Sequence, residues 1–179
     1  MRRGVADSGF QAILPVLPLP TSFPAPAFAL GLCCDETLPA ITSLAFLPPQ
    51  QEMPPKGEFA RAVIAALQDW LRDPCYSFDL PMLMEGTEFQ ERVWAEIAAI
   101  PCGRTTSYAQ IAQNIGSAPR AVGGACGANP IPIIVPCHRV ISKSGKLTGF
   151  SHSRTGWMPE IKRWLLAREG VEIEEGRRA

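Results

Sequence analysis

The chain has 179 residues, of which 46% are hydrophobic and 19% charged, and its formal net charge at pH 7 is zero. A chain of this length can bury a substantial core in one domain or in two small ones. No apolar run is long enough for a transmembrane helix, which argues against a membrane partner, and the proline-rich N-terminus is a poor signal peptide. We therefore expect a cytoplasmic globular protein.

The charges are unevenly distributed along the chain. Residues 1–85 include 5 basic and 9 acidic side chains, whereas residues 86–179 include 12 basic and 8 acidic ones. An acidic half joined to a basic half indicates that only the C-terminal half meets a polyanion.

The cysteine pattern bears on redox state and on metal binding. Six cysteines occur, at positions 33, 34, 75, 102, 126 and 137, and none forms a CxxC pair. In a chain of this length without a signal peptide we expect free thiols rather than disulfides. With only two histidines in the chain, a structural zinc site is not indicated either, and no organic cofactor is expected.

The first part of the chain predicts a small α/β unit. Residues 1–27 are rich in proline and predict an extended lead-in. Two apolar runs at 28–32 and 41–47 flank a polar turn and predict a hairpin. Apolar residues recur at helical spacing over residues 58–73, which predicts an amphipathic helix. A further strand is possible at 77–80.

Two capping boxes then predict two helices. Thr87 and Gln90 open a helix that Pro101 ends, and Ser107 and Gln110 open a short helix that runs through Ile115. After a glycine turn, Pro119 precedes a second helix that ends at Cys126.

Helix, glycine turn and helix are the parts of a helix-turn-helix. The second helix is made largely of alanine and glycine. Such a helix is suited to close packing in a core, and equally to lying deep in a DNA groove with Arg120 at its start. The pattern alone leaves both interpretations open.

The most unusual stretch surrounds Cys137. The β-branched run Ile133–Val135 predicts a buried extended segment, and Pro136 fixes the backbone before the cysteine. Burial alone would raise the pKa of the Cys137 thiol and make it inert, so reactivity requires a nearby base, and His138 is the next residue. The alternative is a core strand with an ordinary cysteine, although buried polar neighbours without a role would be costly.

The chain ends with a predicted helix over 158–169. Its apolar face includes Trp164 and Leu165, and Gly170 follows its last turn. Residues 172–179 form a charged tail that we expect to be frayed.

Several short motifs occur together in the second half of the chain, in a fixed order. They are Gly86-Thr-Glu-Phe89, Ile100-Pro-Cys-Gly103, Ser107-Tyr108, Arg120-Ala-Val-Gly-Gly, Asn129-Pro130, Val135-Pro-Cys-His-Arg-Val140, Gly149-Phe150 and Lys162-x-x-Leu165-Leu166-x-x-Glu169. Over residues 86–170 the sequence thus resembles the O6-alkylguanine-DNA alkyltransferases. The resemblance implies an α/β (α+β) fold with an N-terminal α/β domain at 28–82 and a mainly helical DNA-binding and catalytic domain at 83–171.

The resemblance also implies a reaction. An alkyl group would pass from O6 of guanine in DNA to Cys137 in one irreversible step; transfer from O4 of thymine is left open. His138 would act as the base through a water molecule, and Glu169 would orient that histidine. The product is a thioether, so each protein molecule would react once and be spent.

Further residues take roles by the same resemblance. The helix-turn-helix of a monomer would enter the minor groove of double-stranded DNA, and the O6-alkylguanine nucleotide would be flipped out. Tyr108 would help rotate the phosphodiester and donate a hydrogen bond to guanine N3, and Asn129 would tie the recognition helix to the cysteine loop. Arg120 would fill the space left by the flipped base. The full set comprises, for DNA, Ser107, Tyr108, Arg120 and Ala121, and for the substrate pocket, Val140, Phe150, Ser151 and Lys162.

Two features depart from the family pattern. The turn at 116–119 is about two residues shorter than usual, and the loop at 151–159 is several residues longer. We hypothesise that His152, Arg154 or Trp157 in this loop changes the tolerance for bulky alkyl groups; a plain surface loop is the alternative. Competing functions are a cysteine hydrolase, a sequence-specific regulator and a non-catalytic alkylated-DNA-binding protein.

Overall fold

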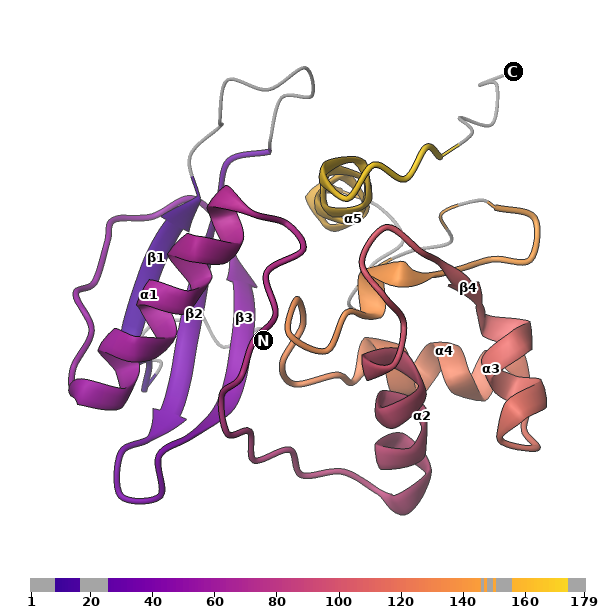
Figure 1. Cartoon of the computed structure of the whole chain (residues 1–179), viewed down its shortest axis with the longest axis horizontal. Coiled ribbons are helices and arrows are strands. Elements are labelled where there is room, and N and C mark those ends of the chain that lie inside the picture. Colours follow the sequence, from indigo (N-terminus) through magenta and orange to yellow (C-terminus); the bar gives the residue numbers. More distant parts are fainter. Residues whose placement is uncertain (1–8, 17–25, 146, 148–149, 151–155, 174–179) are drawn as a thin grey trace, which may run out of the picture.

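An antiparallel three-stranded sheet forms the N-terminal half of the chain (Figure 1). The computed structural model describes residues 9–16, 26–145, 147, 150 and 156–173. The strands, in spatial order, are β1 (Ala12–Val16), β2 (Phe28–Asp35) and β3 (Ala40–Leu47). The β2–β3 pair is the predicted hairpin, and Asp35 closes its turn by accepting hydrogen bonds from the backbone of Thr37 and Leu38.

Strand β1 contradicts part of the predicted lead-in. Residues 12–16 pair with β2 along their whole length, because burying Ala12, Leu14 and Val16 outweighs the proline content of the segment. Pro15 is tolerated since β1 lies at the edge of the sheet, where a missing backbone donor matters least. Residues 1–8 and 17–25 of the lead-in lie outside the described residues.

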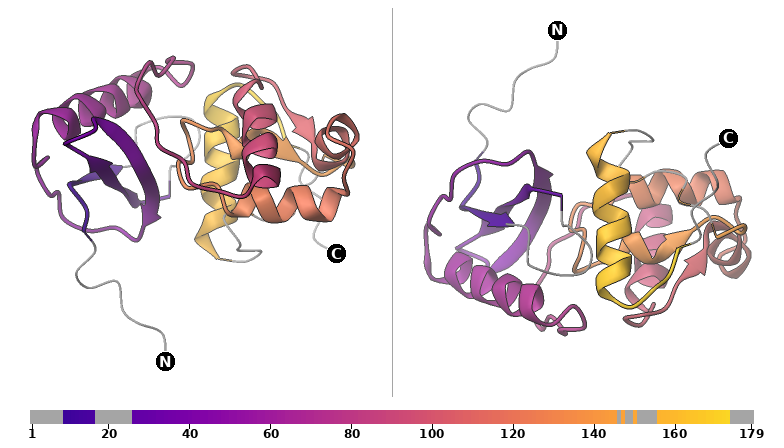
Figure 2. Two further views of the ribbon diagram at one scale, coloured as in Figure 1. Left: turned by 90° about the horizontal axis from the view of Figure 1, so that it is seen from below. Right: turned by 90° about the horizontal axis from the view of Figure 1, so that it is seen from above.

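Helix α1 (Glu58–Arg72) covers one face of the sheet and confirms the helix predicted at 58–73 (Figure 2). Gly57 precedes this helix and offers no capping side chain. Glu36 takes that role, because its carboxylate accepts hydrogen bonds from the backbone N–H groups of Phe59 and Ala60. The strand predicted at 77–80 is absent; the pairing nearby is an isolated bridge between Ile41 and Met82.

The C-terminal half is mainly helical. It contains α2 (Glu88–Ala98), β4 (Thr106–Ser107), α3 (Tyr108–Asn114) and α4 (Pro119–Gly127). Thr87 and Gln90 form the predicted reciprocal capping box at the start of α2. The second predicted box is only half formed, since Ser107 caps Gln110 while the Gln110 side chain donates to Asn114 instead.

Helices α3 and α4 form the predicted helix-turn-helix. The short turn closes with Gly116 at φ 67°, and the backbone of Ser117 donates back to Ala112. From α2, the indole N–H of Trp94 donates to the carbonyl of Ala125 in α4 over 2.9 Å and fixes the second helix of the pair.

The segment before Cys137 is a hydrogen-bonded loop, not the predicted extended strand. Asn129 accepts from the backbone N–H of Ile131 over 3.0 Å and donates to the carbonyl of Val135 over 2.8 Å. These bonds override the β preference of the run and hold Ile133 at φ 78°, a strained conformation for a β-branched residue. A 3-10 turn, η1 (Cys137–Arg139), and strand β5 (Val140–Ile141), parallel to β4, follow.

Helix α5 (Trp157–Arg168) lies between the two halves of the chain, as both views of Figure 2 show, and confirms the helix predicted at 158–169. Trp164 packs edge-on against Phe28 of β2 and Trp70 of α1. The buried side chains of the sheet, α1 and the helical half therefore form one continuous core, and the mixed α/β class is confirmed. In the described part of the chain, no helix is long and apolar enough to cross a membrane.

Replacing Trp164 with alanine should destabilise both halves together. The side chain is fully buried where the halves meet, and such truncations cost about 3–5 kcal/mol. Urea unfolding followed by circular dichroism would measure this loss as a lower midpoint. Trp157→Ala on the same helix is the control, because Trp157 is only partly buried and should cost less. Equal losses for the two variants would contradict the shared core.

Candidate active site

Cys137 lies at the first position of the η1 turn and is only 4% exposed. Burial raises the pKa of the Cys137 thiol, while a hydrogen bond from Asn129 and the positive charge of Lys162 oppose this shift. The thiol form is therefore favoured at rest. A reaction that needs the thiolate must remove this proton within the site.

His138 is placed to accept a proton. Its Nε2 lies 2.8 Å from Oε1 of Glu169, and burial, with the charges of Arg139 and Lys162, lowers the pKa of His138 although this carboxylate opposes the shift. A neutral imidazole beside a carboxylate donates through Nε2, which leaves the lone pair of Nδ1 as the basic position. Within the described part of the chain, the buried Nδ1 atom has no hydrogen-bond partner.

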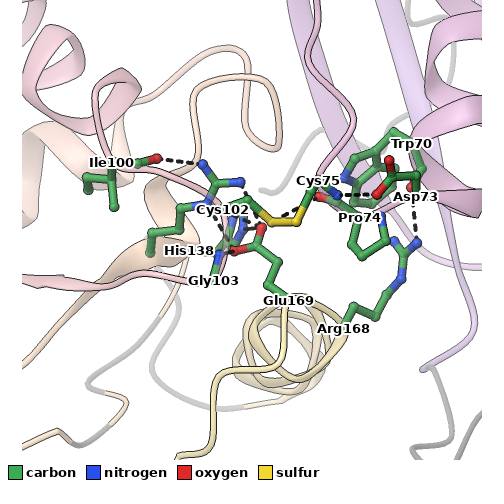
Figure 3. Close-up of a disulfide and its surroundings, with 11 residues drawn as sticks. Trp70, Asp73, Pro74, Cys75, Ile100, Cys102, Gly103, His138, Arg168 and Glu169 are labelled. Atoms are coloured by element: carbon green, nitrogen blue, oxygen red, sulfur yellow. Dashed lines mark hydrogen bonds and ion pairs between the residues drawn. A yellow bond between two sulfur atoms is a disulfide. The ribbon is translucent and has the colours of Figure 1, made fainter.

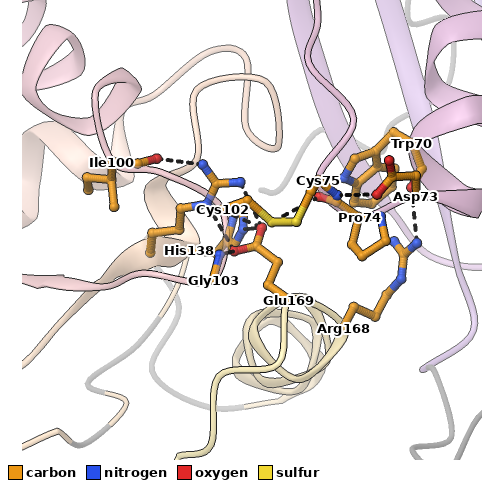
Figure 4. Close-up of polar contacts among 11 residues, drawn as sticks. Trp70, Asp73, Pro74, Cys75, Ile100, Cys102, Gly103, His138, Arg168 and Glu169 are labelled. Atoms are coloured by element: carbon orange, nitrogen blue, oxygen red, sulfur yellow. Dashed lines mark hydrogen bonds and ion pairs between the residues drawn. A yellow bond between two sulfur atoms is a disulfide. The ribbon is translucent and has the colours of Figure 1, made fainter.

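Glu169 follows the last residue of α5, and its carboxylate binds groups from two segments, the η1 turn and the loop after α2 (Figure 4). The guanidinium of Arg139 contacts both carboxylate oxygens, with its Nε 3.0 Å from Oε2 and its Nη2 2.9 Å from Oε1. The backbone N–H of Gly103 donates to Oε2 over 3.2 Å. Burial alone would raise the pKa of Glu169, but the hydrogen bonds and charges of His138 and Arg139 lower it to about 2. Glu169 is thus a fixed negative charge behind the histidine.

Lys162 supplies a buried positive charge that acts on Cys137. Its Nζ donates to the carbonyl of Val140 over 2.6 Å and to the hydroxyl of Tyr108 over 3.3 Å. Burial lowers the pKa of Lys162 to about 8, while Cys137 and Cys126 act in the opposite direction. A cation here favours the thiolate form of Cys137 and fixes the Tyr108 hydroxyl next to the site.

The helix-turn-helix presents the residues predicted to meet DNA. Ser107 caps α3, Tyr108 begins it, and Arg120 and Ala121 are exposed at the start of α4. The opposite side of α4 packs into the core through its buried residues Val122, Ala125 and Cys126. The core-packing interpretation therefore holds for one face of α4, while groove binding by the exposed face stays a prediction.

The predicted pocket residues are only partly described. Val140 and Phe150 are buried, and Nζ of Lys162 lies 5.8 Å from the centre of the Phe150 ring. Ser151, His152 and Arg154 lie outside the described residues, while Trp157 begins α5. The hypothesis that the longer loop reshapes the pocket stays a prediction.

One cysteine prediction was wrong. Cys75 and Cys102 form a disulfide, with Cα atoms 5.4 Å apart, while the other four cysteines are free (Figure 3). The pairing arises because the segment after α1 meets the loop after α2, a contact that 27 residues of sequence separation do not reveal. The described residues contain no group of three or more histidine, cysteine or acidic side chains that could hold a metal ion.

Arg139 and Gly103 are site residues that the sequence reasoning missed. Both bind Glu169, and Arg139 also donates to the carbonyl of Ile100 over 2.6 Å. The signal available was the charge of Arg139 within an apolar segment, because a buried guanidinium needs a carboxylate partner.

A helix-turn-helix joined to a buried cysteine and a histidine–carboxylate pair is the layout of a DNA-binding protein with thiol chemistry. The family model "6-O-methylguanine DNA methyltransferase, DNA binding domain" matches residues 88–171. The chain belongs to this family of methylated-DNA–protein-cysteine methyltransferases.

Individual relatives agree with this assignment. The chain is 47% identical over 115 residues to the methylated-DNA–protein-cysteine methyltransferase of Methanosarcina acetivorans. The aligned region covers 63% of this chain and 70% of that protein. It is 45% identical over 111 residues to the constitutive methylated-DNA–protein-cysteine methyltransferase of Bacillus subtilis. That aligned region covers 61% of this chain and 65% of the relative. The crystal structure of Mycobacterium tuberculosis OGT in complex with DNA superposes with a TM-score of 0.66 at 36% identity, covering 88% of this chain and 91% of the other.

Proposed function

We propose that this protein repairs DNA by transferring an alkyl group from O6 of guanine to Cys137 in a single turnover. The observation that carries the proposal is the buried Cys137 followed by His138, whose imidazole is paired with Glu169. Family membership supports it, because the relatives are named for the same transfer from DNA to a protein cysteine.

Each of the site residues has its own role in the reaction. Nδ1 of His138 takes the thiol proton of Cys137 through one water molecule, and the carboxylate of Glu169 stabilises the imidazolium that forms. The thiolate attacks the alkyl carbon, the bond from that carbon to O6 breaks, and the released guanine takes up a proton. The new bond is a thioether, which has no leaving group that water could displace, so the protein stays alkylated.

Access to the base follows from the helix-turn-helix. O6 faces the major groove, so a monomer bound in the minor groove must flip the alkylated nucleotide out of the base stack before reaction, at a cost of about a few kcal/mol. The exposed face of α4 carries only small side chains beyond Arg120, including Ala121 and Gly124, and this allows close approach to the groove floor. Arg120 then occupies the space of the flipped base, Tyr108 assists the rotation, and Val140 and Phe150 line the pocket.

An intact-mass measurement tests the proposal. Incubation with an O6-methylguanine oligonucleotide should add the mass of one methylene group to the peptide that contains Cys137, and the reaction should stop at one equivalent. Turnover beyond one equivalent would indicate a hydrolase instead. Tight lesion binding without any adduct would indicate a non-catalytic damage-binding protein.

Arg120→Ala should weaken DNA binding and slow the reaction of duplex DNA. The side chain is exposed at the start of α4, so its loss removes a cationic contact without disturbing the core. A guanidinium in the space of the flipped base places its charge among the phosphates, so its loss should reduce the salt dependence of binding by about one counterion. Fluorescence anisotropy at several salt concentrations measures this slope, with the exposed Arg61→Ala on α1 as the control. Unchanged binding in Arg120→Ala would contradict the docking face.

A further inference from the structure

Two contacts between the N-terminal half and the catalytic half meet at the end of α5 (Figures 3 and 4). The first is Arg168, whose guanidinium donates to the carbonyls of Trp70 and Leu71 over 3.0 and 2.7 Å. It also lies 4.7 Å from the ring centre of Trp70 and 4.8 Å from that of Trp164. Arg168 thus holds the C-terminus of α1 against α5, one residue before Glu169.

The second contact is the Cys75–Cys102 disulfide. Cys75 lies three residues beyond α1. Cys102 directly precedes Gly103 in the chain, and the N–H of Gly103 donates to Glu169. The disulfide therefore anchors the loop that supplies one of the hydrogen bonds on the catalytic carboxylate. Gly103 itself has φ 72°, a conformation that glycine adopts without strain.

We propose that the Cys75–Cys102 disulfide is a redox-responsive brace, which holds the Gly103 amide on Glu169 and thereby sets the rate at which His138 activates Cys137. The inference rests on the proposed alkyl transfer and adds a control of the same site. It also gives the N-terminal half a role in the reaction, because one end of the brace is attached to α1.

The brace is accessible to reductants. Cys75 is exposed and Cys102 is half-buried, and exposed disulfides are the ones that exchange readily with thiols. A small dithiol can reduce the bond, giving one electron and one proton to each sulfur and closing into its own disulfide. Both cysteines then become thiols, and no other atom of the site changes.

Reduction frees a loop that has few other contacts. Pro101, Gly103 and Arg104 are exposed, and the loop's own backbone hydrogen bond runs from Arg104 to Pro101. Without the disulfide, the Gly103 amide is held by its bond to Glu169, by the Arg104–Pro101 turn and by the bond from Arg139 to the carbonyl of Ile100. The hydrogen bond from Gly103 to the carboxylate of Glu169 is then weaker, and this carboxylate is less well fixed against the imidazole of His138. Arg139 still keeps the carboxylate ionised.

The experiment compares single-turnover transfer by the oxidised protein and by the protein treated with excess dithiothreitol, at increasing concentrations of O6-methylguanine duplex. The maximal rate should fall roughly three- to tenfold on reduction, because one charge-assisted hydrogen bond is weakened while those of Arg139 remain. The duplex concentration at half-maximal rate should not change, since neither cysteine of the brace lies in α3 or α4.

Matched variants separate the brace from other thiols. Cys75→Ser should show the reduced rate in both conditions and lose its response to dithiothreitol. Cys33→Ser removes a half-buried free thiol of β2 and should keep both the rate and the response. The amide proton resonance of Gly103 gives a readout without DNA: reduction should move it upfield as its bond to the carboxylate weakens.

The outcomes distinguish this inference from the proposed function. Equal maximal rates in the two redox states, or a change only in the half-maximal concentration, would overturn the brace while leaving alkyl transfer in place. An amide proton resonance of Gly103 that is the same before and after reduction would also overturn the brace. If neither redox form transfers an alkyl group, the proposed function itself fails.

Discussion

Cys137→Ala should abolish alkyl transfer completely and leave binding to O6-methylguanine DNA intact. The sulfur is the atom that accepts the alkyl group, and no neighbouring side chain can replace it as a nucleophile in the same position. The side chain is buried and lies outside α3 and α4, so its truncation should not alter the exposed residues of the helix-turn-helix. The variant would then behave as a non-catalytic damage-binding protein.

Cys126→Ala is the matched control for this substitution. Cys126 is also a buried free cysteine, on the core face of α4, and its replacement removes the same group from the interior. Intact mass spectrometry and anisotropy with a lesion-containing duplex measure both properties. We expect an adduct in Cys126→Ala and none in Cys137→Ala; an adduct on any other residue of Cys137→Ala would contradict the assignment of the nucleophile.

Glu169→Gln should slow transfer roughly 10²- to 10⁴-fold, the range over which positioned acid–base groups contribute to catalysis. A neutral amide cannot stabilise the imidazolium of His138, and it leaves the guanidinium of Arg139 without its anion. Breaking a buried pair in this way also destabilises proteins by about 3–5 kcal/mol. Single-turnover rates and urea unfolding measure the two effects, with the exposed Glu172→Gln as the control.

The same carboxylate makes the protein sensitive to acid. The pKa of Glu169 is about 2 in the folded protein and 4.5 ordinarily, so its ionised form stabilises the fold at any pH above 4.5. This contribution, about 3 kcal/mol, is lost as the pH falls from 4.5 towards 2. Burial also lowers the pKa of His138, so protonation of the unfolded chain adds a further loss below pH 6.5. Unfolding titrations of Glu169→Gln should lack the step between 4.5 and 2; a step that persists would assign it to another carboxylate.

Local signals in the sequence accounted for most helices and for one strand pair. The period of apolar residues located α1, α2 and α5, and Thr87 with Gln90 marked the start of α2, because these signals act within a few residues. Strand β1 was missed since its stability comes from pairing with β2, which outweighs its proline. The extended segment predicted before Cys137 was wrong because the side chain of Asn129 supplies hydrogen bonds that propensity does not consider.

The site was predictable where residues are adjacent and not where the chain returns from a distance. Cys137 and His138 are neighbours, and the resemblance to a family placed Glu169 with them. The bonds from Arg139 and Gly103 to that carboxylate span 30 and 66 residues, and Cys75 meets Cys102 across 27. Such contacts depend on how α5 packs between the halves, which no local pattern encodes.

The position of α5 has a consequence for attempts to shorten this protein. The family model begins at residue 88, which suggests cutting the chain there, yet Trp164 and Arg168 on α5 rest on Phe28 and Trp70. A fragment that begins at that residue would present an uncovered tryptophan and an unpaired cation to water, on the same helix that ends at Glu169. The N-terminal sheet and α1 therefore cover one face of α5. A shortened protein would need substitutions on that face before it could fold and react.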